Sequence, residues 1–287
     1  KAWFLCKVIA KEFSLGSMDG FQFNISVGYD LEGIKSEKID NFLNTMQHAQ
    51  DSDIFRTCRE YLLAHTDLFE HVTKEDIESI SGDICNSVTI STLHGCPPQE
   101  IERIAMYLIT EKGFHTFIKC NPTLLGYEYA RKMMDDMGYD YVAFGDFHFK
   151  DDLQYEDAVP MLTRLMKVCE ERNLEFGVKI TNTFPVDVKQ NELPSEEMYM
   201  SGKSLYPLSI SVAAKLAKDF GGKLRISYSG GADFYNIKDI VEAGIWPVTV
   251  ATTLLKPGGY DRMSQMASLL EKEGAVFAGV DADAVSR

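Results

Sequence analysis

The sequence lacks the features that mark several large classes of protein. Its six cysteines are scattered and form no C-x-x-C pair, which argues against a disulfide framework, an iron–sulfur cluster or a structural zinc in these 287 residues. No apolar run approaches the ~18 residues of a membrane span, and the chain does not open on a signal peptide. We therefore expect a cytoplasmic protein with reduced thiols and no membrane partner.

Basic residues are also scarce. The chain has 29 Lys and Arg against 43 Asp and Glu, a formal net charge of −14. Because nucleic acids and anionic membranes select basic surfaces, this balance argues against both as partners. An anionic ligand would instead be held by local donors, such as backbone N–H groups and one or two placed cations.

Strand-like and helical patterns alternate along the chain. The helical patterns include PPQEIERIAMYLITEKG, which has prolines at its start, one apolar face and Gly113 after its end. Such alternation predicts parallel β-strands joined by helices. The expected strands are residues 21–27, 87–92, 114–120, 141–147, 176–183, 224–229 and 248–252.

Seven strands in this length favour an α/β protein with a (β/α)8 TIM barrel, for which ~250 residues is typical, over an open doubly wound sheet. The count is one or two strands short. The chain opens on Lys1, already inside an amphipathic helical pattern. We therefore expect one barrel domain over residues 1–287, cut from a longer chain and lacking its N-terminal one or two βα units. Residues 39–82 are expected to form a mainly helical insertion.

Small, donor-rich residues follow the last two expected strands. They are Ser229, Gly230 and Gly231 after one, and Ala251, Thr252 and Thr253 after the next. A TIM barrel commonly holds a phosphate on these two loops, and glycines let backbone N–H groups approach it closely. We expect these segments to meet Ser201 and Gly202 at one end of the barrel. An ordinary glycine turn is the alternative.

Several motifs carry a resemblance to known families. The segment from MSGKSLYPLSI to VTVATTLL is similar in order and spacing to the last quarter of the FMN barrels of dihydropyrimidine and dihydroorotate dehydrogenases. Together with SVTISTLHGCPPQEIERIA, NPTLLGY, VKITNTF and LLKPGGY, it resembles the YgfK-type family, named as a selenate reductase subunit, over essentially the whole chain. The resemblance implies a dihydroorotate-dehydrogenase-like barrel that binds FMN.

The same resemblance implies a longer flavoprotein that also carries FAD, iron–sulfur clusters and an NAD(P)H site, encoded among purine-catabolic genes. The family name implies selenate as substrate, whereas the chemistry of the relatives and the purine setting imply reduction of an electron-poor heterocycle such as urate. Two other classes stay open. One is a flavin-free barrel lyase or isomerase that acts on a phosphorylated metabolite, and the other is an electron-transfer subunit without chemistry of its own.

Polar residues late in two apolar strands are candidates for flavin contact. The resemblance places Lys119 in the role of a flavin-contacting lysine, and Lys179 occupies a similar position in GVKITNTF. A cation there would stabilise the anionic reduced flavin, although a lysine can also extend to solvent from a strand end. Other candidates at these strand ends are Asn121, Thr181, Asn182 and Thr183. Asn24 is a candidate substrate-binding residue, with a hydrogen-bonded core amide as the alternative.

The catalytic acid is expected in the loop STLHGCPP. The resemblance aligns Thr92 near the acid or base of the related dehydrogenases, but a threonine is a poor proton donor. His94 and Cys96 lie in the same loop and are better suited to proton transfer. The other histidines have no metal-ligand spacing, so we expect no metal site.

Overall fold

The central feature of the computed structural model is a parallel β-sheet whose strand order follows the chain. The model describes residues 1–91, 95–271 and 277–287. The sheet order is β1-β2-β3-β4-β7, and every pairing is parallel. Its strands are β1 (Ile25–Val27), β2 (Ser87–Ile90), β3 (His115–Cys120), β4 (Phe176–Ile180) and β7 (Arg225–Tyr228). A parallel bridge from Tyr228 to Val248 continues the series.

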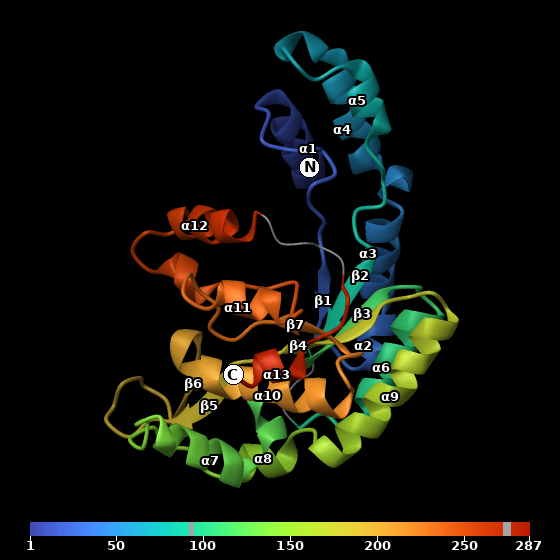
Figure 1. The fold of residues 1–287 in the computed structure, drawn as a ribbon. Coiled ribbons are helices and arrows are strands. Elements are labelled where there is room, and N and C mark those ends of the chain that lie inside the picture. The colour runs from blue at the N-terminus through green and yellow to red at the C-terminus, as the bar shows by residue number, and fades with distance from the viewer. Residues whose placement is uncertain (92–94, 272–276) are drawn as a thin grey trace.

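This strand order distinguishes a barrel from a doubly wound sheet. A doubly wound sheet reverses its strand order at a switch point, whereas neighbouring strands here always follow one another along the chain. Helix α6 (Pro98–Thr110) follows β2. Helix α9 (Tyr155–Glu171) precedes β4, and helix α10 (Tyr206–Asp219) precedes β7. Figure 1 shows them packed around the outside of the sheet.

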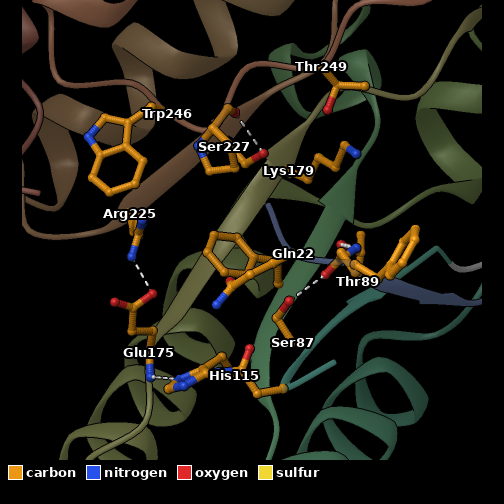
Figure 2. A pocket seen from close by; sticks show the side chains of 15 residues that line it. Gln22, Ser87, Thr89, His115, Glu175, Lys179, Arg225, Ser227, Trp246 and Thr249 are labelled. Carbon is orange, nitrogen blue, oxygen red and sulfur yellow. Dashed lines mark hydrogen bonds and ion pairs between the residues drawn. The ribbon is translucent and has the colours of Figure 1, made fainter. Parts of the chain in front are cut away.

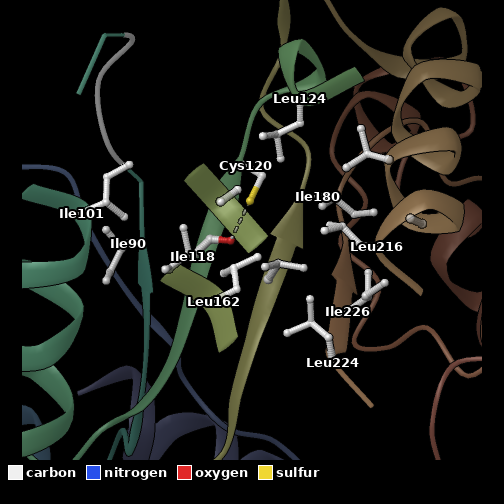
Figure 3. Close-up of a cluster of buried hydrophobic side chains, with 14 of the residues drawn as sticks. Ile90, Ile101, Ile118, Cys120, Leu124, Leu162, Ile180, Leu216, Leu224 and Ile226 are labelled. Atoms are coloured by element: carbon white, nitrogen blue, oxygen red, sulfur yellow. Dashed lines mark hydrogen bonds between the residues drawn. The ribbon is translucent and has the colours of Figure 1, made fainter. Parts of the chain in front are cut away.

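The two faces of the sheet differ in chemistry because successive side chains alternate. On the outer face, Ile118, Ile180 and Ile226 are buried and pack in one cluster with Leu162 of α9 and Leu216 of α10 (Figure 3). On the inner face, β3 carries Lys119, β4 carries Lys179 and β7 carries Ser227. A TIM-barrel interior is usually filled by branched apolar residues, so this polar inner face is unusual.

A helical arm projects beyond the sheet. In Figure 1 it contains α1 (Ala2–Glu12), α4 (Asp53–Ala64) and α5 (Lys74–Ser79). Trp3 and Phe4 of α1 pack with Phe55 of α4 in an apolar cluster separate from the main core. We propose that the residue 39–82 part of this arm is an insertion within one barrel domain.

The remaining elements connect these parts. The helices are α2 (Leu31–Lys35), α3 (Glu37–Gln47), α7 (Tyr127–Asp136), α8 (Phe147–Asp151), α11 (Ile237–Glu242), α12 (Asp261–Leu270) and α13 (Ala282–Val285). Short 3-10 helices are η1 (Ala49–Asp51), η2 (Thr66–Leu68), η3 (Pro122–Leu125), η4 (Gly202–Leu205) and η5 (Thr252–Leu255). An antiparallel hairpin pairs β5 (Phe184–Asp187) with β6 (Glu197–Met200). No helix in the described part of the chain is long and apolar enough to cross a bilayer.

One predicted strand is wrong. Residues 141–147 form no strand, because β3 pairs directly with β4 and leaves no position between them. The apolar pattern there arises from Phe144, which is buried against Phe184 with their ring centroids 4.9 Å apart. The β5–β6 hairpin was not predicted, and the expected strand at residues 248–252 is reduced to the single bridge at Val248.

Candidate functional site

The carboxyl ends of β3, β4 and β7 meet at one edge of the sheet. Register pairs Lys119 with Lys179 and Ile180 with Tyr228, so the polar residues that follow these strands lie at similar heights. This is the edge at which TIM barrels bind ligands.

A cavity of about 260 Å³ lies at this edge. Eleven of the fourteen predicted cofactor-binding residues line it: Lys119, Thr181, Thr183, Ser201, Gly202, Ser229, Gly230, Gly231, Ala251, Thr252 and Thr253. The three small-residue segments therefore meet, as their places in the sequence predict. The hydroxyl oxygens of Ser201 and Thr252 are 3.4 Å apart.

Close backbone packing explains the glycines. Gly231 has φ +82°, and a Cβ atom there would lie 2.2 Å from the carbonyl oxygen of Gly202. A Cβ atom on Gly230 would lie 2.1 Å from Oγ of Ser209. The backbone N–H groups of Gly230 and Gly231 donate no hydrogen bond within the described residues. Two unused donors in a glycine loop are what an anionic group requires.

Two residues that support this loop were not among the predicted site residues. Tyr228 is fully buried, and its hydroxyl donates to the carbonyl of Gly230 at 2.8 Å. Ser209 on α10 is also fully buried, and its hydroxyl lies 2.7 Å from that of Thr181. Together they fix the carbonyl of Gly230 and the end of β4 from behind. Their position depends on contacts distant in the sequence, so only the alternation of β7 could have pointed to Tyr228.

The two candidate lysines differ in where they lie. Lys119 is half-buried, lines the 260 Å³ cavity, and has no hydrogen bond or ion pair with any described residue. Burial lowers its pKa. Lys179 is also half-buried, and its pKa is lowered first by burial and then by the charge of Lys119. Two cations on adjacent strands, neither with an ion-pair partner among the described residues, favour an anionic or electron-rich group nearby.

Lys179 instead lines a second cavity of about 610 Å³ near the amino ends of the strands, which Figure 2 shows. Asn24 lines the same cavity, so the structure does not place it with the residues at the carboxyl edge. Its Nδ2 donates to Thr89 at 3.1 Å, and its Oδ1 accepts from Ser87 at 2.9 Å. Its role in substrate binding stays a prediction.

Asn121 and Asn182 form a hydrogen-bonded pair beside the edge. Nδ2 of Asn182 donates to Oδ1 of Asn121 at 2.7 Å, and Nδ2 of Asn121 donates to Oδ2 of Asp152 at 2.9 Å. Asp152 is 5% exposed and had no part in the sequence prediction. These side chains are therefore joined in one network that the motifs did not reveal.

Of the three candidate acids, the structure describes Cys96, while Thr92 and His94 lie outside the described residues. Cys96 is partly buried, and burial, assisted by the carboxylates of Glu100 and Asp30, raises the pKa of its thiol. It shares a small cavity with Lys119 and Asn121. A thiol that keeps its proton is suited to act as an acid rather than as a nucleophile.

A family model described as the N-terminal TIM-barrel domain of oxidoreductase YgfK matches residues 1–287. The chain belongs to the YgfK family. The oxidoreductase YgfK of Escherichia coli strain K12 is 46% identical over 293 residues, covering 98% of this chain and 28% of the relative. The YgfK protein of Escherichia coli O157:H7 matches with the same values. The chain thus spans 28% of the length of these relatives.

Two crystal structures of DHODH from Eimeria tenella are similar at 16% identity. The ligand-free one has a TM-score of 0.35 and covers 68% of this chain and 63% of its own. The complex with ferulenol has a TM-score of 0.37, with 72% and 64% covered. The model of the YgfK family describes a TIM-barrel domain, which confirms the predicted fold class.

Proposed function

We propose that this barrel is an FMN-dependent reductase domain that acts on a C=C or C=N bond of an electron-poor heterocycle. One observation carries the proposal: a glycine loop shares a cavity with a half-buried lysine, and neither the N–H groups of the two glycines nor the ammonium has a partner in the part of the chain that the structure describes. The loop fits a phosphate and the lysine fits an anionic ring edge. A cofactor with a phosphate at one end and an anionic ring edge at the other would match these two features.

The residues fit FMN in a definite orientation. Ser201, Gly202, Gly230 and Gly231 would hold the phosphate, assisted by Ser229 and by the Ala251–Thr252–Thr253 segment. Lys119, with Thr181 and Thr183, would face the ring system, and Lys179 would add positive charge from the adjacent strand. FMN, when bound, supplies the hydride for the reduction. The protein supplies position and electrostatics.

The asparagine pair and Cys96 would handle the substrate. An amide offers both a donor and an acceptor, so Asn121 and Asn182 can orient the ring of a heterocycle by its edges. Because the pKa of Cys96 is raised, its thiol stays protonated at neutral pH and can deliver the proton that must accompany a hydride. His94 and Thr92 remain candidates in the same loop, and Asn24 remains a candidate substrate contact.

For the whole protein we propose an electron path from NAD(P)H through FAD and iron–sulfur clusters to FMN. The relatives are several times longer than this chain, which leaves room for the domains that such a path requires. A purine such as urate is the substrate that we propose, in a cytoplasmic enzyme. Selenate, the substrate that the family name implies, is the comparison compound.

The test uses the complete polypeptide, purified anaerobically. We expect a flavin absorbance that includes FMN, that bleaches with NADH or NADPH, and that returns on addition of urate with consumption of the purine. Bleaching without any response to purines would indicate that the domain only transfers electrons. Recovery of the flavin absorbance with selenate alone would indicate that selenate, as the family name implies, is the substrate.

A lysine with a lowered pKa also suits a Schiff base, so a flavin-free lyase or isomerase is the second candidate. It predicts no flavin and borohydride trapping of a carbonyl metabolite on Lys119. Stoichiometric FMN in the purified protein excludes it.

A further inference from the structure

Asp152 has no role in the proposed reaction, yet it joins two segments of the candidate site. It directly follows α8, and its carboxylate is almost fully buried at 5% exposure. Oδ2 accepts hydrogen bonds from Nδ2 of Asn121 at 2.9 Å and from Oγ1 of Thr123 at 2.8 Å. Oδ1 accepts from the backbone N–H of Gly95 at 3.2 Å. One carboxylate therefore joins the turn after β3 to the segment that carries Cys96.

The carboxylate also sets the direction of the amide pair. An ionised carboxylate only accepts hydrogen bonds, so Asn121 must turn its Nδ2 toward Asp152 and its Oδ1 away from it. Oδ1 of Asn121 then accepts from Nδ2 of Asn182. Asp152, Asn121 and Asn182 thus form a hydrogen-bonded relay. Oδ1 of Asn182, which has no partner within the described residues, is the acceptor at its open end.

The backbone at Gly95 is fitted to the end of α8. Gly95 has φ +75°, and a Cβ atom there would lie 2.4 Å from Oδ2 of Asp151. Asp151 is exposed and its carboxylate can move, so the positive φ is what favours glycine here. The next residue, Cys96, lines a small cavity of about 20 Å³ together with Asn121 and Asp152. One oxygen of the carboxylate therefore holds the residue before Cys96, and the other holds the amide pair.

We propose that Asp152 is a positioning residue, which holds the Cys96 segment against β3 and fixes the hydrogen-bonding direction of Asn121 and Asn182. The contact itself does not depend on the flavin. Only the catalytic meaning of the parts that it positions rests on the proposed function.

The test is the rate at which iodoacetamide alkylates each cysteine in the complete polypeptide, followed by mass spectrometry. In Asp152→Asn the new amide has only one oxygen, so it cannot accept on both sides from Gly95 and Asn121. At one of the two contacts the new NH2 group then faces another N–H donor, and that hydrogen bond is lost. Loss of one such hydrogen bond predicts a rise of about fivefold or more in the Cys96 rate. Cys85 and Cys169 are 3% and 1% exposed and lie outside the small cavity that Cys96 and Asp152 line, so they report global unfolding and their rates should stay unchanged.

Thr123→Val is the matched control. It removes another hydrogen bond to the same carboxylate but leaves the tie to Gly95, so the Cys96 rate should match wild type. The flavin gives a second readout, because a displaced relay should shift the FMN absorbance maximum in Asp152→Asn while Thr123→Val leaves it in place.

Equal acceleration at Cys96, Cys85 and Cys169 would overturn the proposal, since Asp152 would then only stabilise the fold. An unchanged Cys96 rate would overturn it as well. If Asp152→Asn does not purify, Asp152→Ser is labelled in the same way, and failure of both to fold would also count against a positioning role. A flavin-free protein would refute the proposed function yet leave the labelling result decisive.

Discussion

Replacing Lys119 by methionine tests the proposed flavin site most directly. Methionine keeps an unbranched side chain of similar length and removes the charge, so packing around the half-buried stem is largely preserved. If the ammonium stabilises an anionic reduced flavin, its loss should lower the FMN reduction potential. A lysine that merely extends to solvent would leave the potential unchanged.

The magnitude follows from Coulomb's law. One unit charge 4–5 Å from the ring, at an effective dielectric of ~20, contributes about 3–4 kcal/mol. Lys119 is only half-buried, so solvent screening reduces this, and we take about a third, ~1 kcal/mol. For a two-electron couple that corresponds to a fall of ~20 mV. The absence of a carboxylate partner within the described residues means that no ion pair is broken at the same time.

The assay is an anaerobic redox titration of the complete polypeptide against a reference dye. Lys132→Met is the control, because Lys132 lies on α7 with its side chain 74% exposed and should not affect the potential. Lys179→Met is measured alongside, since Lys179 is paired with Lys119 in the sheet register. A shift in Lys179→Met alone would transfer the role to that residue. Wild-type potentials in both variants would refute the electrostatic argument.

Three further predictions concern the same edge. Gly231→Ala should lower the free energy of unfolding in urea by ~1 kcal/mol or more beyond the loss in Gly126→Ala. Both glycines have positive φ, but only at Gly231 would a Cβ lie against a backbone oxygen, so equal losses would contradict the close approach. Tyr228→Phe should lose about 1–2 kcal/mol by leaving the carbonyl of Gly230 without its donor, while Tyr206→Phe, which loses no such bond, should lose less; the reverse order would contradict this. Alkylation of Cys96 should require a higher pH than an ordinary thiol because its pKa is raised, and a midpoint at or below pH 8.5 would show that burial does not control it.

The carboxyl-edge cavity could be predicted because it depends on simple geometry. Parallel strands place their ends at one edge, so the small residues after the strands had to lie near one another. The Ser229–Gly230–Gly231 loop is the clearest case, since a side chain on Gly230 would collide with Ser209 and one on Gly231 would collide with the backbone of Gly202. Such positions are visible in the sequence because glycine and strand ends are local signals.

The network around Asp152 could not be predicted, because no local sequence signal shows that Asp152 joins Asn121 to the segment of Cys96. Asp152 reads as the end of a short helix, and its hydrogen bonds reach Asn121 and Gly95, which are 31 and 57 residues away. The false strand at residues 141–147 has a similar origin. Alternating apolar residues fit either a strand or a loop pinned by one buried aromatic ring, and only the direct β3–β4 pairing decides between them.

The sequence alone could not decide between Lys119 and Lys179 as the flavin-contacting residue, and the structure separates them. Each is the penultimate residue of its strand, so no motif ranks one above the other. Register makes them neighbours, yet Lys119 lines the carboxyl-edge cavity and Lys179 lines the cavity near the amino ends. Each lysine lowers the free-energy cost of placing a negative charge beside it, and it raises the cost of keeping the neighbouring lysine charged. A negative group bound at one lysine therefore changes the electrostatic energy of the other. The pair should therefore be treated as one electrostatic unit, and the double variant should shift the flavin potential by an amount that differs from the sum of the single shifts.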